Sequence, residues 1–216
     1  MFNSSIRILS ILTLSFTGFA CQPEAVEPTS STSALSEPTV STITGPIATT
    51  QYGPVRGTEE NGIQIFKGVR YGADTATTRF APPKAPQPWT EPADALAFGN
   101  TAPQPARSFS IGLFDSWTPE PTPGMGEDCL FLNVWTPALA DGAKRPVLVW
   151  FHGGGFSSGS GSSNAYDGAR LAARGDAVIV TVNHRLNVFG YLYLDQYGEQ
   201  FAGSANAGIM DLVASL

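Results

Sequence analysis

Cysteine and histidine are scarce in this sequence. Among 216 residues there are two cysteines, Cys21 and Cys129, and two histidines, His152 and His184. The histidines have no partners at the spacing of metal ligands, so we expect no metal and no cofactor. Two cysteines allow one disulfide at most, and that bond is lost if either cysteine is modified.

Basic side chains are also few. The chain has 12 Lys and Arg against 18 Asp and Glu, which gives a formal net charge of −6. No cluster of Lys and Arg interrupts this acidic balance. Binding to nucleic acid requires such clusters to neutralise phosphates, so nucleic acid is excluded as a partner.

The sequence has no apolar run long enough to span a bilayer. Residues 1–20 contain one charge, Arg7, before the short apolar run Ile8–Phe16, which is typical of an export signal. The segment Thr17–Ala20 before Cys21 resembles a bacterial lipobox, in which the cysteine is diacylated, although Gly18 stands where Leu is usual. We expect an exported cell-envelope lipoprotein whose only membrane contact is a lipid on Cys21. Simple cleavage and secretion is the alternative.

Two further regions follow this leader. Residues 21–44 are rich in Pro, Ser, Thr and Glu and contain almost no large apolar side chains, which predicts a disordered tether because the segment cannot bury enough surface to fold. Residues 45–216 form the predicted folded region, and its length of about 170 residues is enough for a sizeable core.

The order of elements predicts an α/β fold. Strands are expected at Gly53–Gly57 and Ile63–Val69, on either side of an Asn61-Gly62 hairpin turn. A Pro-rich stretch over residues 82–123 predicts a long loop that lines a site or wraps the domain. Further strands are predicted at Leu130–Trp135, Pro146–Phe151 and Ala177–Val182, and helices at Tyr166–Arg174 and from Asn206 to the last residue.

The run Pro146–Phe151 is apolar without alternation. Such a run predicts a strand that is buried on both faces of a mostly parallel sheet. The alternation of strand, loop, helix and strand that follows it supports the same architecture.

A glycine-rich stretch follows this strand. Gly155-Phe156-Ser157-Ser158-Gly159 spells G-x-S-x-G, the pattern of a hydrolase nucleophile elbow. An elbow needs a strand directly before the motif and a helix directly after the serine. His152-Gly153-Gly154 separate the motif from the strand, and the residues after Ser157 are poor helix formers. We therefore do not assign Ser157 as a nucleophile.

A strand followed by His-Gly-Gly-Gly is typical of an esterase oxyanion loop. Glycines allow main-chain N–H groups to approach a substrate closely and to stabilise the charge on an ester oxygen under attack. A flexible Gly/Ser hairpin loop is the alternative interpretation.

Several motifs in order resemble the type-B carboxylesterase family, which includes cholinesterases and bacterial para-nitrobenzyl esterases. Glu127–Pro137 is similar to a signature of that family, and Phe66–Tyr71 resembles its F-x-G-I-P-Y, with Arg70 in place of proline. Val182–Arg185 and Asn206–Asp211 resemble two later motifs. The resemblance extends from about Gly53 to the last residue and implies an α/β-hydrolase fold and hydrolysis of small carboxylic esters.

The resemblance also implies roles for single residues. Gly154 and Gly155 align with glycines whose N–H groups form the oxyanion hole, and Gly153 shapes the turn. Gly153, Phe156 and Trp117 are candidates for contact with the substrate. Phe114 is a second aromatic of the same loop as Trp117, and packing is an equal alternative for both. The catalytic serine, acid and histidine of the family lie further along the chain, so they are expected beyond residue 216.

Neither histidine fits the catalytic base. We expect His152 to orient the loop and His184 to pack.

Structural contacts follow from the resemblance too. It implies ion pairs between Glu127 and Arg79 and between Asp211 and Arg185. The family cysteine that pairs with Cys129 is replaced by Ala102, so Cys129 is expected to be a buried thiol and its loop to lack a tether.

Two functions from different classes remain. The first is a serine carboxylesterase whose N-terminal, truncated part is this chain, which by itself would be inactive. The second is a non-catalytic, cholinesterase-like binding module. The residue at the downstream elbow separates them, since a serine there supports the enzyme.

Overall fold

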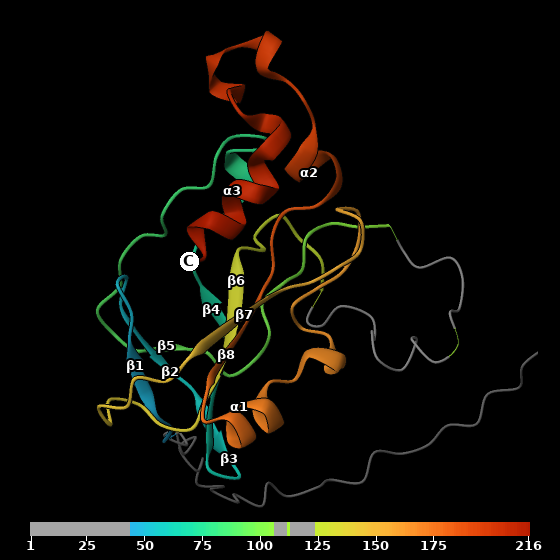
Figure 1. Cartoon of the computed structure of the whole chain (residues 1–216). Coiled ribbons are helices and arrows are strands. Elements are labelled where there is room, and N and C mark those ends of the chain that lie inside the picture. The colour runs from blue at the N-terminus through green and yellow to red at the C-terminus, as the bar shows by residue number, and fades with distance from the viewer. Residues whose placement is uncertain (1–43, 106–111, 113–123) are drawn as a thin grey trace, which may run out of the picture. The chain divides into compact units, whose positions relative to one another are not determined.

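The computed structural model describes residues 44–105, 112 and 124–216 (Figure 1). The candidate residues Cys21, Phe114 and Trp117 lie outside this part of the chain. The predicted export signal and nearly all of the predicted tether also lie outside it, so both stay predictions.

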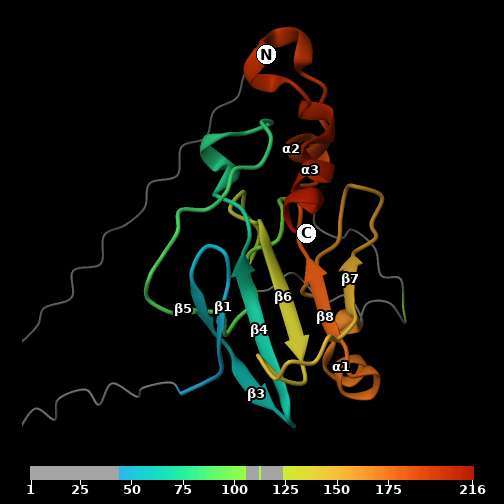
Figure 2. The ribbon, with the colours of Figure 1, turned by 60° about the vertical axis from the view of Figure 1, so that its left-hand side comes forward.

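A five-stranded sheet is the centre of the fold. Its strand order is β3-β4-β6-β8-β7. Figure 2 shows the longer strands side by side, with β7 at one edge. The bounds are β3 Thr58–Glu60, β4 Ile63–Arg70, β6 Phe131–Thr136, β7 Val147–Phe151 and β8 Val178–Val182.

The prediction of a mostly parallel sheet is wrong for these residues. β3 with β4, β4 with β6, and β6 with β8 pair antiparallel, and only β7 with β8 pair parallel. The parallel pair is the one connected through a helix, as a crossover requires. The earlier strands are joined by a hairpin or by long loops, which allow antiparallel pairing.

The hairpin turn at Asn61-Gly62 is confirmed. Both residues have left-handed φ angles, 51° and 75°, as a tight hairpin turn requires. The partner of β4 across this turn is β3, paired from Glu60 with Ile63. The predicted arm Gly53–Gly57 instead holds β2, Pro54–Arg56, which belongs to a second sheet with β1, Ile47–Thr49, and β5, Ala93–Asp94.

The helices are short. α1 spans Ala169–Gly175, α2 Asn187–Tyr191 and α3 Ala207–Ala214. α1 begins later than predicted, after a 3-10 turn at Asn164–Tyr166, and α3 ends before the last residue. Further 3-10 turns lie at Thr75–Thr77, Asp195–Tyr197, Glu199–Phe201 and Ser204–Asn206. No helix in the described ranges has the length and apolarity needed to cross a membrane.

Packing is concentrated on β4, β6 and β8. Trp135 of β6 and Val182 of β8 are almost fully buried, and each belongs to an apolar cluster that includes residues from other elements. β7 differs, because the prediction of burial on both faces is wrong. Val147, Leu148, Trp150 and Phe151 are 60, 43, 43 and 40% exposed. Within the described residues β8 is the only strand paired with β7, which leaves its other hydrogen-bonding edge open.

Candidate active site

The glycine loop, defined here as His152–Ser163, begins directly after β7. β7 and β8 run parallel, and Figure 2 shows their arrowheads pointing toward the end of the sheet where α2 and α3 lie. In α/β sheets, ligands bind outside the carboxyl ends of parallel strands. The loop therefore occupies the end of the sheet at which a site is expected.

The backbone of the loop requires glycine at Gly154. Its φ angle is +125°, and a Cβ atom there would lie 1.9 Å from the main-chain oxygen of Ser158. Gly155 has φ +61°, but a Cβ there would meet no atom within 4 Å. Gly154 is therefore required because a side chain would not fit there, and both Gly154 and Gly155 have backbone conformations that favour glycine.

Hydrogen bonds fix the direction of the peptide between Gly154 and Gly155. The Gly154 carbonyl accepts the main-chain N–H groups of Ser157 and Ser158, at 3.1 and 3.2 Å. Because a trans peptide holds its C=O and N–H on opposite sides, the N–H of Gly155 points away from the turn. Across the described part of the chain, neither the Gly154 nor the Gly155 N–H donates a hydrogen bond. Both are free for a ligand.

Ser157 does not have the surroundings of a nucleophile. It lies in a turn, and the next helical segment begins at Asn164. Its Oγ donates to the Gly154 carbonyl at 3.0 Å and, among the residues that the structure describes, has no histidine or carboxylate partner. A serine hydroxyl without a neighbouring base is not activated for attack. The geometry therefore agrees with the interpretation that the G-x-S-x-G letters do not form an elbow here.

The two histidines stack on each other. His152 and His184 have ring centroids 4.8 Å apart and nearly parallel planes. Nδ1 of His152 bonds to the Gly153 carbonyl at 2.8 Å, and Nδ1 of His184 bonds to the Arg185 carbonyl at 2.9 Å. Burial lowers the pKa of His152 to about 4, and it also lowers the pKa of His184. Both rings are neutral at pH 7. His152 is placed to orient the loop.

The candidates for substrate contact have different positions. Gly153 is exposed beside the turn. Phe156 is 60% exposed, with its ring 4.9 Å from that of Tyr191 in α2. Its exposure leaves the ring available to a ligand at the mouth of the loop.

The far end of the loop is anchored in the sheet. The Gly161 N–H donates to Oδ1 of Asn183 at 2.7 Å, and the Gly161 carbonyl accepts from the Thr181 hydroxyl at 2.7 Å. The carboxamide of Asn133 in β6 donates to the same carbonyl and to Thr181 Oγ1. Buried amide side chains thus satisfy the main chain where the loop rejoins the core.

Sequence patterns did not identify two polar side chains that hold the middle of the loop. Gln104 forms two hydrogen bonds to the main chain of Gly159, and Asn187 bonds to Ser157. The signal that could have found Gln104 was its place two residues after Ala102, the position of the missing family cysteine. For Asn187 no sequence pattern distinguished it from a surface residue.

Both ion pairs that the resemblance implied are present. Nε of Arg79 lies 2.5 Å from Oε2 of Glu127. Arg185 and Asp211 are 1 and 0% exposed and are joined at 2.7 and 2.9 Å. Buried charges of this kind need full hydrogen bonding, and Arg185 also donates to two main-chain carbonyls. Both pairs join residues that are far apart in the sequence.

Arg70, where the family has proline, forms a third pair. Its guanidinium binds both carboxylate oxygens of Asp128, at 2.6 and 2.7 Å, and stacks over the ring of Phe131. The bidentate bond raises the pKa of Arg70, although burial opposes this shift. The substitution therefore replaces a rigid backbone position by a link between β4 and the start of β6.

Cys129 is a free, fully buried thiol, as predicted. Burial raises its pKa far above the usual value. Cys129 and Ala102 belong to one apolar cluster. The residue that replaces the partner cysteine thus packs in the same cluster as Cys129 without a covalent bond.

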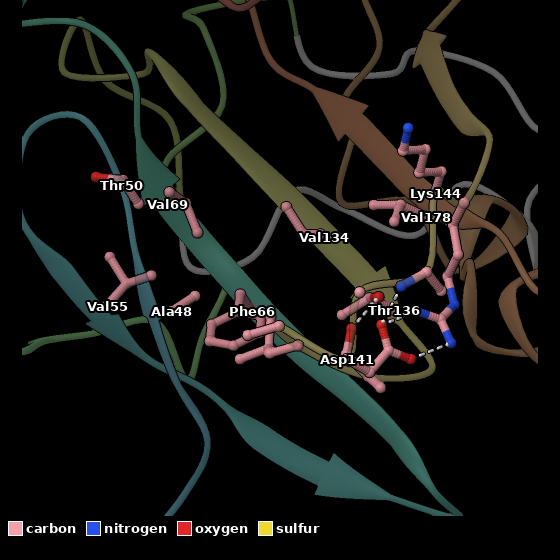
Figure 3. A pocket seen from close by; sticks show the side chains of 16 residues that line it. Ala48, Thr50, Val55, Phe66, Val69, Val134, Thr136, Asp141, Lys144 and Val178 are labelled. Atoms are coloured by element: carbon pink, nitrogen blue, oxygen red, sulfur yellow. Dashed lines mark hydrogen bonds and ion pairs between the residues drawn. The ribbon is translucent and has the colours of Figure 1, made fainter.

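A cavity of about 530 Å³ lies elsewhere, between the second sheet and the main sheet (Figure 3). Its walls include Val55, Phe66 and Val134, and its rim includes the residues before β7. The Asp141 carboxylate at this rim is held by Arg145, and that bond lowers its pKa to about 2. The cavity therefore has no poised base. Moreover, no residue from Gly153 to Phe156 lines it, so we place the candidate site at the glycine loop.

Metal chemistry has no support in the described ranges, where no group of three His, Cys, Asp or Glu is arranged to hold an ion. The groups that the loop offers are main-chain amides. They can stabilise negative charge on an oxygen but cannot attack a carbonyl.

Comparison with known proteins gives consistent results. Residues 44–216 match the model of the carboxylesterase family. The para-nitrobenzyl esterase of Bacillus subtilis is 42% identical over 175 residues, which cover 81% of this chain and 34% of the relative. Phenmedipham hydrolase of Pseudarthrobacter oxydans is 40% identical over 69% of this chain and 30% of that protein.

Solved structures agree with these relatives. A carboxylesterase of Geobacillus stearothermophilus superposes with a TM-score of 0.69 at 43% identity, covering 78% of this chain and 32% of that one. An esterase from Clostridium hathewayi, described as able to hydrolyse aliphatic aromatic polyesters, has a TM-score of 0.72 at 44% identity and covers 79% and 33%. This chain spans about a third of the length of these proteins. It belongs to the carboxylesterase family, with part of an α/β-hydrolase fold.

Proposed function

We propose that this chain is the N-terminal part of a serine carboxylesterase and that it supplies two donors of the oxyanion hole, the N–H groups of Gly154 and Gly155. The observation that carries the proposal is that both amides are unpaired at the carboxyl end of the parallel strand pair. The nucleophile, acid and base would come from polypeptide that follows Leu216.

The chemistry requires such donors. When a nucleophile attacks an ester carbonyl, negative charge develops on the carbonyl oxygen, and preorganised N–H groups stabilise that charge more than they stabilise the ground state. One donor contributes on the order of 3 kcal/mol in enzymes of this kind. The Gly155 donor is already oriented, because the Gly154 carbonyl of the same peptide is fixed by Ser157 and Ser158.

The substrate class follows from the relatives. Their names describe hydrolysis of para-nitrobenzyl esters and of phenmedipham. We infer a small carboxylic ester for this protein, with Gly153 and Phe156 beside its carbonyl. Trp117 stays a prediction, because it lies outside the described residues.

The test uses the protein expressed from the complete reading frame, assayed with p-nitrophenyl acetate. Gly155→Ala is compared with Gly142→Ala, since both glycines have left-handed φ angles and an open position for Cβ. Both variants should lose about 1–2 kcal/mol of stability from left-handed alanine. Only Gly155→Ala should lose activity, by about a hundredfold, because the added methyl group and the strained peptide displace the donor.

Two outcomes would reject the proposal. The first is equal activity of Gly155→Ala and the parent enzyme. The second is a residue other than serine at the downstream elbow together with no hydrolysis of any ester, which would favour the non-catalytic binding module.

The 216-residue chain alone should not turn over p-nitrophenyl acetate, since Ser157 has no activating base among the described residues and the family's catalytic serine, acid and histidine are expected after Leu216. Turnover that disappears in Ser157→Ala would contradict this and make Ser157 the nucleophile after all.

We also propose export, with lipid attached to Cys21. The protein from the native host should partition into detergent, and Cys21→Ser should move it to the aqueous phase. Partition of both forms into water would indicate secretion instead.

A further inference from the structure

Asn187 has an unusual backbone conformation. It is the first residue of α2 and has a φ angle of 53°. Residues other than glycine are uncommon in this left-handed region, and asparagine is one of the few that enter it. An asparagine at a position where glycine would be less strained indicates that its side chain has a structural or functional role.

The polar atoms of Asn187 hold two different segments. Its main-chain N–H donates to the Phe156 carbonyl at 2.8 Å. Its side-chain Nδ2 donates to the Ser157 carbonyl at 2.9 Å and to the Pro103 carbonyl at 3.2 Å. Asn187 thus donates hydrogen bonds to two consecutive carbonyls of the glycine loop and to the Pro103 carbonyl, which links the two segments.

Gln104 makes a second link between the same segments. Its Oε1 accepts the Gly159 N–H at 2.8 Å, and its Nε2 donates to the Gly159 carbonyl at 3.0 Å. The loop is therefore held at Phe156 and Ser157 by Asn187 and at Gly159 by Gln104. These contacts lie directly after Gly154 and Gly155, the two glycines with free amides.

The segment that receives these bonds is itself fixed. Thr101 and Ala102 are 0 and 2% exposed, and Ala102 packs in the cluster of Cys129. The Asn100 carbonyl accepts from the Asn183 side chain at 3.0 Å. No disulfide ties the segment to Cys129, and hydrogen bonds join it to the glycine loop instead.

We propose that Asn187 and Gln104 are positioning residues that form a clasp, joining the glycine loop to residues 100–104 and fixing the direction of the Gly154 and Gly155 amides. The proposal rests on the proposed function of those amides. The clasp acts through the loop and touches no reacting atom.

The test compares Asn187→Gly with Asn61→Gly in the protein from the complete reading frame. Both changes replace a left-handed asparagine by glycine, and Asn61 lies in the β3–β4 turn. Asn187→Gly should lower kcat about tenfold with KM within a factor of about two, because misplaced donors weaken transition-state binding selectively. Asn61→Gly should keep the parent's kcat.

A second pair of measurements distinguishes misdirected Gly154 and Gly155 amides from a general loss of order in the site. A trifluoromethyl ketone, which forms a tetrahedral oxyanion on the nucleophile, should bind Asn187→Gly about tenfold more weakly than the parent. The corresponding methyl ketone should bind both equally. Gln104→Met should act in the same direction.

Each remaining outcome has a definite meaning. Unchanged kcat in Asn187→Gly, a rise in KM alone, or an equal loss in Asn61→Gly overturns the clasp while the proposed function stands. If the parent hydrolyses no ester, the proposed function fails and hydrogen exchange of residues 152–160 decides the clasp. Exchange about tenfold faster in Asn187→Gly supports it, and unchanged exchange overturns it.

Discussion

β8 and β7 are adjacent parallel strands with similar sequences and opposite surroundings. Val178–Val182 consists of β-branched residues throughout, and Val147–Phe151 consists of β-branched or aromatic residues except for Leu148. Ile179, Thr181 and Val182 are buried, whereas four of the five residues of β7 are at least 40% exposed. β8 has β6 on one side and β7 on the other, while β7 has only β8 in the described part of the chain.

The difference shows what an apolar run can and cannot predict. It indicates that a strand suits burial on both faces, because apolar surface is driven from water. It does not say which polypeptide provides the cover. An exposed apolar strand with an open edge is also a site for association with other chains.

The largest expected difference in stability is between two changes. One removes the partner of Arg185, which follows β8, and the other removes a partner of Arg145, which precedes β7. Asp211→Ala should destabilise the fold by about 3–5 kcal/mol, because it leaves Arg185 charged, buried and unpaired. Asp141→Ala should cause a much smaller loss, because the Asp141 side chain is 37% exposed and Arg145 keeps its second partner, Asp176. Urea unfolding of both variants measures the two losses. Similar unfolding midpoints for Asp211→Ala and Asp141→Ala would contradict the prediction.

The next effect concerns the histidines that follow the two strands. The pKa of His152 falls from about 6.5 in the unfolded chain to about 4 in the fold, mainly through burial. The unfolded chain therefore binds the proton more tightly, so stability is full above pH 6.5 and declines as the pH falls to about 4, by on the order of 3 kcal/mol. His184 shifts in the same direction.

Thermal unfolding between pH 7 and pH 4 measures this loss. His152→Gln should flatten the decline and leave the smaller part from His184. The same slope in both proteins would mean that His152 is not buried as the stacked geometry requires.

A matched truncation tests the strands directly. Val182→Ala in β8 should cost about 2 kcal/mol, since Val182 is fully buried in the cluster of Cys129. Val147→Ala in β7 should cost less than about 0.5 kcal/mol, since Val147 is 60% exposed. If, in the protein from the complete reading frame, Val147→Ala costs as much stability as Val182→Ala, then further polypeptide covers β7 in that protein.

The smallest effect on stability is expected from Leu148→Lys in β7. The side chain is 43% exposed, so the change should alter stability by less than about 0.5 kcal/mol. It should, however, reduce self-association of the 216-residue chain, because lysine on an edge strand opposes pairing with other edges. Sedimentation velocity measures the self-association. Unchanged association in Leu148→Lys would mean that the chains associate through another surface.

Local signals predicted the parts of the fold that depend on neighbours in the chain. The Asn61-Gly62 turn, β6 and β8 were found within one or two residues, because turn chemistry and apolar runs act locally. The family resemblance supplied what local patterns do not contain, namely the partners of Glu127 and Asp211 and the burial of Cys129.

Other features depend on contacts that no local pattern records. The bonds from Asn187 to Ser157 and Pro103 join residues 30 and 84 positions apart. Such pairs arise only when the loops meet in space.

By itself the sequence determined which groups this chain can offer: glycines after an apolar strand, and two arginines whose partners a family pattern named. The tertiary structure decided which strands run parallel, that β8 is the one strand paired with β7 among the described residues, and that the Gly155 amide points away from its turn. The physical reason is that residue types and turns act over a few neighbours, whereas strand pairing, burial and amide direction depend on segments that are distant in the chain.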